Sequence, residues 1–226
     1  FVSGLALYGD IEGCIRAGSF VPSLRLFSGK VFNDDGQEQH EFVEKSIEEA
    51  VRYFHGHYQC RVFNLSYGDL NKVYDGRHVR GLAYTLDRLT REIGVLFVVP
   101  TGNFDIPANP RENYPDYLLL DDARLLDPAP ALNVITVGGV ARHTASRASQ
   151  SYPNHIEDIP IAGESHPAPF TRAGLSIGGA IKPDFVEEAG NAAVRRTTGR
   201  IQHQGLGVLS LNSGFAAGRA FSEDAG

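Results

Sequence analysis

The sequence predicts an α/β fold in three layers, with a mostly parallel sheet and helices on both faces. Apolar strand-like runs alternate with segments of helical periodicity, which is typical of a parallel sheet wrapped by helices. Two of these strands continue into small polar residues and glycine, in FNLSYGD at 63–69 and VVPTGNF at 98–104. Right-handed crossovers bring the carboxyl ends of parallel strands to one edge, where α/β proteins bind ligands. Both stretches are therefore expected at that edge.

The first half of the chain supplies five elements. LRLFSGKVF, residues 24–32, alternates β-forming residues and is expected to be a strand, as are RVFNLSYG at 61–68 and VLFVV at 95–99. Apolar residues at three- and four-residue steps predict helices over 39–55 and 77–93, the second followed by a glycine that stops it. VLFVV is nearly all apolar, as expected for a strand covered on both faces.

The second half is less regular. NVITVGGV at 133–140 is a further strand, IKPDFVEEAG at 181–190 contains a short one, and the Gly- and Ser-rich tail has another at 208–211. Residues 105–131 and 141–169 are expected to form long loop segments. No repeat or linker divides the chain, so the whole of it, 1–226, is predicted to be a single domain.

Composition narrows the function. The formal net charge is -6 and there is no long basic run, which argues against a nucleic-acid or anionic-membrane partner. No apolar stretch approaches a membrane span, and no signal peptide is visible. Cys14 and Cys60 lack metal-ligand spacing and are expected to be free buried thiols. Low Cys usage fits a reducing, cytoplasmic compartment but leaves the localisation unknown. No motif for a cofactor or metal is found.

Gly102-Asn103 is the first candidate site. Glycine lets the chain turn sharply after a strand, and the next side chain is then presented over the sheet edge. An Asn there offers two N–H donors without charge, which suits an oxygen that becomes negative during a reaction. The alternative, which spacing alone favours, is an Asn that only caps a turn or the next helix.

Ser66-Tyr67-Gly68 is the second candidate. An extended stretch at the rim of a sheet can pair with a peptide substrate through main-chain hydrogen bonds. The alternative is a strand end whose Ser bonds its own backbone, and spacing alone again favours this alternative.

Several runs together resemble a known family. NLSYG, VPTGN, NVITVGGV and IKPDFVEEAG occur in this order and resemble N-x-S-x-G, A-x-G-N, V-I-x-V-G-A and K-P-D-x-x-A-P-G of the subtilisin-like serine proteases, the subtilases. LRLFSGKVF resembles the strand after the family's histidine helix, and PFTRAG at 169–174 resembles its F-S-x-x-G segment. The resemblance covers nearly the whole chain. It implies a serine endopeptidase that cleaves peptide or protein substrates through an acyl-enzyme.

The two ends resemble halves of the catalytic motifs. Phe1-Val2-Ser3-Gly4 is similar to the second half of H-G-T-x-V-A-G, and the final Gly226 to the first glycine of G-T-S-x-A. The resemblance therefore implies a His just before residue 1, a Ser just after residue 226 and an Asp further upstream. The fragment alone is then expected to be inactive, with other domains of the parent chain as partners.

The resemblance also implies roles for particular residues. Asn103 would be the oxyanion-hole donor, Lys182-Pro183-Asp184 would be structural, and the substrate-binding residues would be Ser66, Tyr67 and Gly68 in one cleft wall and Pro100, Thr101 and Gly102 in the specificity pocket. Asp34-Asp35 and Asp121-Asp122 are candidate calcium ligands, since some subtilases bind calcium, with solvated turn residues as the alternative.

The chain departs from the family pattern at two places, so its substrate specificity does not follow from the resemblance. Pro100 stands where a small residue is usual and cannot donate to a strand ladder, and Glu187-Glu188 replace Ala-Pro. One alternative is a non-catalytic pseudoprotease or peptide-binding α/β module. A nucleotide-binding domain would need a glycine-rich loop after a first strand, and none is present. All eight histidines are expected to be surface residues: His40, His55, His57, His78, His143, His155, His166 and His203.

Overall fold

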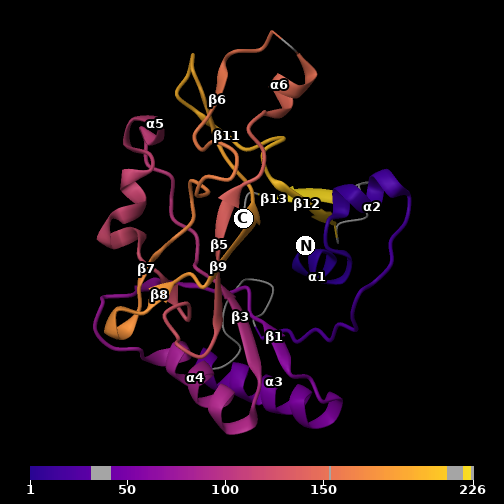
Figure 1. Cartoon of the computed structure of the whole chain (residues 1–226), viewed down its shortest axis with the longest axis vertical. Helices are drawn as coiled ribbons and strands as arrows, with labels where there is room; N and C mark the ends of the chain where they lie inside the picture. The colour runs from indigo at the N-terminus through magenta and orange to yellow at the C-terminus, as the bar shows by residue number, and fades with distance from the viewer. Residues whose placement is uncertain (32–41, 153, 213–220, 225–226) are drawn as a thin grey trace.

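A four-stranded parallel sheet in the order β1-β3-β5-β9 lies at the centre of the computed structural model, which describes residues 1–31, 42–152, 154–212 and 221–224 (Figure 1). Its strands are β1 (Val62–Asn64), β3 (Leu96–Pro100), β5 (Ile135–Ala141) and β9 (Phe185–Ala189). All three pairings are parallel. The predicted α/β class with a mostly parallel sheet is confirmed.

Two amphipathic helices, α3 (Val43–Tyr58) and α4 (Gly81–Ile93), pack with the sheet (Figure 1). Their apolar residues recur on one side, so each helix buries a single stripe against the strands. The buried core that results is made of Val43, Ile47, Val51, Leu82, Ala83, Leu86, Leu89, Val95, Phe97, Val99, Ala131 and Val134. The glycine stop of α4 is confirmed, since Gly94 adopts φ 68. The first residues of the predicted helix, 39–41, lie outside the described residues.

The start of α4 is capped from a distant segment. Arg80 makes no side-chain cap, and the carboxylate of Asp127 instead accepts from the backbone N–H of Leu82 at 3.1 Å and of Ala83 at 2.8 Å. Burial raises the pKa of Asp127, while the two backbone hydrogen bonds oppose that shift. Asp127 belongs to β4 (Leu126–Asp127), which pairs antiparallel with β2 (Asp69–Val73). A side chain of the segment 105–131 thus caps the start of α4, one of the two helices that pack with the parallel sheet.

The strand predicted at 24–32 is wrong for residues 24–31, which form no strand, and residue 32 lies outside the described residues. Phe27 stacks on Tyr58 of α3 with ring centroids 4.5 Å apart, and Val31 packs against the main core. A Cβ on Gly29 would lie 2.8 Å from the ring of Phe54. Phe27 and Gly29 therefore lie against α3, and Val31 lies against the core. The alternation reports one-sided burial of an extended segment rather than strand pairing.

The remaining elements are short. Of the strand predicted at 61–68, only Val62–Asn64 form a strand, β1. The strand predicted at 208–211 is confirmed as β12. The others are α1 (Val2–Tyr8), α2 (Ile11–Ala17), α5 (Pro110–Asn113), α6 (Arg147–Ser151), β6 (Asp158–Pro160), β7 (Gly174–Leu175), β8 (Ile181–Lys182), β10 (Ala193–Arg195), β11 (Ile201–Gln202), β12 (Val208–Leu211) and β13 (Phe221–Asp224), with 3-10 turns at Asp116–Leu119, Asp121–Ala123 and Ile177–Gly179.

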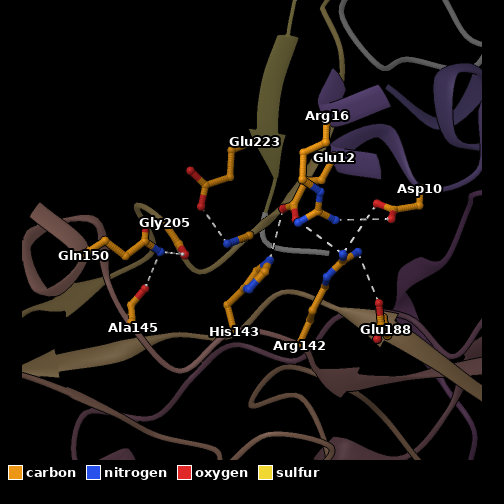
Figure 2. A network of polar contacts seen from close by, with 11 residues as sticks. Asp10, Glu12, Arg16, Arg142, His143, Ala145, Gln150, Glu188, Gly205 and Glu223 are labelled. Atoms are coloured by element: carbon orange, nitrogen blue, oxygen red, sulfur yellow. Dashed lines mark hydrogen bonds and ion pairs between the residues drawn. The ribbon is translucent and has the colours of Figure 1, made fainter. Parts of the chain in front are cut away.

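Charged side chains attach α2 to the carboxyl ends of β5 and β9 (Figure 2). Arg142, directly after β5, places its guanidinium 3.3 Å from Glu12 and 3.2 Å from Glu188. His143 contacts the other oxygen of Glu12 at 3.2 Å. The helix before α2 is fixed separately, because Ser210 of β12 donates a hydrogen bond to the carbonyl of Phe1 at 2.7 Å. Thus α2 is held at the carboxyl edge of the parallel sheet and α1 against β12.

A second, antiparallel sheet in the order β11-β10-β6 is centred on one buried carboxylate. Asp158, whose side chain is 2% exposed, accepts from Arg195 Nε at 2.9 Å and from Ser146 Oγ at 2.8 Å. Nε2 of His155 lies 3.2 Å from the same carboxylate. Hydrogen bonding to Arg195 is the largest cause that lowers the pKa of Asp158 to about 2, although burial opposes it. The segment 141–169 thus contains β6, an edge strand of this antiparallel sheet.

Replacing Asp158 by Asn is expected to lower the free energy of unfolding at pH 7 by about 2 kcal/mol, the size that follows from a pKa lowered from 3.8 to about 2. Because the pKa is lower in the folded state, this stabilisation is complete above the unfolded-state value and is lost as the pH falls toward 2. Urea unfolding of both proteins between pH 7 and pH 2 measures it. The exposed Glu164→Gln serves as the control, and a difference that stays constant with pH would contradict the assignment.

Candidate functional site

The carboxyl ends of β1 and β3 open onto one cavity of about 580 Å³. Parallel pairing of adjacent strands puts their ends at the same edge, so segments far apart in the sequence meet there. Five of the seven predicted site residues line this cavity: Ser66, Pro100, Thr101, Gly102 and Asn103. The rest of the lining includes residues of β5 and β9, such as Val137 and Glu187, together with Phe170 and Thr171.

The other two predicted residues, Tyr67 and Gly68, are not part of the cavity lining. Tyr67 packs against the main core. Gly68 lies against the turn after β3, because a Cβ at Gly68 would lie 3.6 Å from Cα of Gly102 and 3.3 Å from Leu126. The stretch 66–68 therefore touches the turn that carries Asn103, but only Ser66 lines the cavity.

Pro100 ends the ladder between β1 and β3. The register pairs Asn64 with Val98, and Leu65 N–H donates to the carbonyl of Val98 at 3.0 Å. The next donor in a parallel ladder would be the N–H of residue 100, directed at the carbonyl of Leu65, and proline has none. That carbonyl accepts from Tyr67 N–H at 2.9 Å instead. The chain from Ser66 onwards therefore leaves the sheet at the cavity, which accounts for a proline in a central strand.

Gly102 makes the turn that presents Asn103. Its φ of 93° lies in the region that favours glycine, and a Cβ there would lie 2.6 Å from Cδ1 and 2.7 Å from Cγ of the buried Leu126. The side chain that follows, Asn103, is exposed at the cavity. No hydrogen bond of its amide group to another described residue is found. The amide is thus not used to cap its own turn.

Residues 170–172 brace this turn, although no site role was expected for them. Phe104 N–H donates to the carbonyl of Phe170 at 2.8 Å, and Arg172 N–H donates to Oγ1 of Thr101 at 3.3 Å. Oγ1 of Thr171 accepts from the N–H of Gly139 in β5 at 3.0 Å. The resemblance of PFTRAG to a family motif pointed to this segment but assigned no role to its polar residues.

The Lys-Pro-Asp run joins β8 to β9 and β5. The ammonium group of Lys182, whose side chain is 2% exposed, donates to the carbonyl of Val134 at 2.9 Å and to Asp184 at 2.7 Å. The same carboxylate accepts from the N–H of Thr136 at 2.7 Å. A buried cation with both partners satisfied fixes the neighbouring strands, which fits the structural role expected for this run.

Ionisable groups at the cavity are few. Of the described lining residues, the charged ones are Glu187 and Glu188, and Glu188 is paired with Arg142. A serine nucleophile is activated by a histidine that hydrogen-bonds its hydroxyl, and no histidine within the described ranges makes such a bond. The eight histidines were expected to be surface residues, but the side chains of His143 and His155 are only 27% and 17% exposed and each lies against a carboxylate. His55 is also half-buried, and His40 lies outside the described residues.

The structure bears on other expectations as well. Cys14 and Cys60 are free, but each is half-buried rather than buried. The described residues contain no group of three or more His, Cys, Asp or Glu arranged to hold a metal ion. Asp34-Asp35 lie outside them, and Asp121 is paired with Arg124 at 2.7 Å. In the part of the chain that is described, no helix combines the length and the apolarity needed to cross a bilayer.

Comparison with known proteins yields two findings. The family model "Peptidase_S8: Subtilase family" matches residues 1–220. A protein of Sinorhizobium fredii (strain NBRC 101917 / NGR234), which bears the name "Uncharacterized protein y4bN", is 37% identical over 182 residues. That similarity covers 76% of this chain and 42% of the relative, so the chain spans less than half the length of the curated relative it matches.

Replacing Gly102 by Ala is expected to lower the free energy of unfolding by about 2–4 kcal/mol, because the methyl group adds overpacking against Leu126 to the strain of a positive φ. Gly94→Ala is the matched control: φ is +68° there, but nothing lies within 4 Å of the added Cβ. The control should lose only about 1–2 kcal/mol. Denaturant unfolding measures both, and equal losses would show that Leu126 does not confine the turn.

Proposed function

Since this chain belongs to the subtilase family and is a domain of the subtilase protease type, we propose that the whole protein is a serine endopeptidase. It hydrolyses peptide bonds in peptide or protein substrates through an acyl-enzyme. One observation supports this proposal above all. The unbonded amide of Asn103 and the wall residue Ser66 line one cavity at the carboxyl edge of a parallel sheet.

In the proposed reaction a serine hydroxyl attacks the carbonyl carbon of the scissile peptide bond, and a histidine base takes its proton. The electron pair of the carbonyl moves onto its oxygen, which becomes negative. The Asn103 amide group donates hydrogen bonds to that oxygen and stabilises the tetrahedral intermediate. When the intermediate collapses, the amine leaves with the proton from the histidine and the acyl-enzyme remains.

The reaction needs a nucleophile, a base and an orienting carboxylate. The sequence contains neither H-G-T nor G-T-S, so the proposal assigns the triad to parts of the protein other than residues 1–226. These residues act as one domain that supplies the oxyanion donor and the substrate cleft. The partners proposed for this domain are the peptide substrate and the rest of the parent chain.

Substrate binding is proposed to use main chain along one wall and a pocket on the other side. Pro100 ends the ladder after Leu65, so residues 66–68 leave the sheet beside the cavity, and the main chain of this stretch is proposed to pair with a substrate strand. Tyr67 and Gly68 would contribute through their backbone, since neither lines the cavity. Pro100, Thr101 and Gly102 form the adjoining surface of the cavity, where a substrate side chain would lie.

Replacing Asn103 by Ala in the full-length enzyme is expected to lower kcat about 10²–10³-fold with little change in KM, because the amide acts only on the charged intermediate. This magnitude was established on a subtilisin and is carried over to a relative rather than obtained from this structure. Asn109→Ala, at an exposed Asn outside the cavity lining, is the control. Peptide hydrolysis measures both, and an Asn103 variant of normal kcat would remove the amide from the mechanism.

A fluorophosphonate probe for activated serines is expected to label the full-length protein and to leave the fragment of residues 1–226 unlabelled. The physical reason is that a serine reacts with such a probe only when a base activates it. Gel fluorescence measures the labelling. A labelled fragment would place the nucleophile within these residues, and an unlabelled full-length protein that still binds peptides would favour the peptide-binding module.

A further inference from the structure

Arg172 joins the proposed oxyanion turn to two other segments. Its Nε donates to the carbonyl of Asn103 at 2.8 Å. Its Nη1 donates to the carbonyls of Asp122 at 2.6 Å and of Arg124 at 2.8 Å. The guanidinium also lies 5.3 Å from the ring centroid of Phe104, the residue after Asn103. One side chain thus contacts both residues that follow Gly102 and the loop opposite them.

This guanidinium is a buried charge held mainly by backbone. Arg172 is 6% exposed, and no carboxylate oxygen of another described residue lies within ion-pair distance of it. Burial lowers the pKa of Arg172, with the fields of Asp105 and Asp122 acting in the opposite direction, and an arginine remains charged under all ordinary conditions. The cost of burying this cation is offset by three carbonyl bonds and an aromatic face.

The geometry calls for arginine in particular. A guanidinium presents several N–H donors in a rigid planar fork, so it can bind carbonyls of separate segments at fixed angles. A lysine ammonium keeps the charge but lacks the fork, and a neutral side chain would leave buried carbonyls without donors. Arg172 therefore restricts the peptide that follows Asn103 in position and orientation.

We propose that Arg172 is a positioning residue for the Asn103 amide and holds it where the negative oxygen of the reaction develops. This inference rests on the proposed function. Stabilisation of an oxyanion requires donors fixed before the reaction, and displacement by about 1 Å is enough to cost about 10²-fold in rate. The guanidinium acts through the Asn103 peptide and does not itself contact the substrate.

The first test measures kinetics of the full-length enzyme. Arg172→Lys is expected to lower kcat about 10–100-fold and to leave KM within about threefold, because the donor is displaced in the transition state while binding is retained. Arg195→Lys is the matched control, since Arg195 is also bound by two guanidinium hydrogen bonds, to Asp158 of the antiparallel sheet. A normal kcat in the Arg172 variant would overturn the proposal.

The second test is a double-mutant cycle. If Arg172 acts through the amide, then Arg172→Lys added to Asn103→Ala should lower kcat by no more than about threefold beyond the Asn103 variant. A further drop equal to that of the single Arg172 variant would show that the two residues act independently, and would overturn the proposal while leaving the role of Asn103 intact.

The third test needs no catalytic activity, so it separates this inference from the proposed function. In hydrogen–deuterium exchange of the full-length protein, Arg172→Gln should speed exchange of the Phe104 amide, which is bonded to Phe170, by at least about tenfold. Arg195→Gln should not change it. Unchanged protection of Phe104 in the Arg172 variant would exclude a positioning role whether or not the protein hydrolyses peptides.

Discussion

The parallel register of β1, β3 and β5 is the constraint on which the rest of the site depends. Because these strands run in one direction and are adjacent, Ser66 and Asn103 are brought to a single cavity although 37 positions separate them in the chain. Each local feature then acts within that arrangement. Gly102 turns the chain over the edge, and Leu126 beneath it leaves room for no other residue. A sheet of different order would have produced the same turns without a shared cavity.

Outside the parallel sheet, buried charged side chains supply hydrogen bonds that strand pairing supplies within it. Backbone groups in irregular segments still need partners once they are removed from water. Arg172 supplies donors to three carbonyls, Lys182 to one, and Asp158 holds an antiparallel sheet through Arg195 and Ser146. Each of these side chains meets partners from distant parts of the chain, so the loops around the cavity depend on single residues more strongly than the helices do.

Periodicity in the sequence was enough to predict the main helices and the parallel strands, and with them the edge at which the cavity lies. These features follow from local patterns of burial, which a single segment contains. The same logic failed at 24–32, where Phe27 packs against a helix and Val31 against the core, and neither pairs in a sheet. Arg172 and Asp158 could not be found in this way, since their partners lie up to 69 positions away and no periodicity records such a contact.

Pro100 ends the pairing of β1 with β3 because proline has no backbone N–H. The backbone pairs with β3 as far as Leu65, and beyond it the chain leaves the ladder, with the N–H of Tyr67 bonded back to the Leu65 carbonyl. Any other amino acid at position 100, however small, would bring an N–H able to compete with Tyr67 for the Leu65 carbonyl and so lengthen the ladder by one rung. Proline at position 100 thus sets the length of the ladder between β1 and β3, and alanine there would allow one further pair of residues to join it.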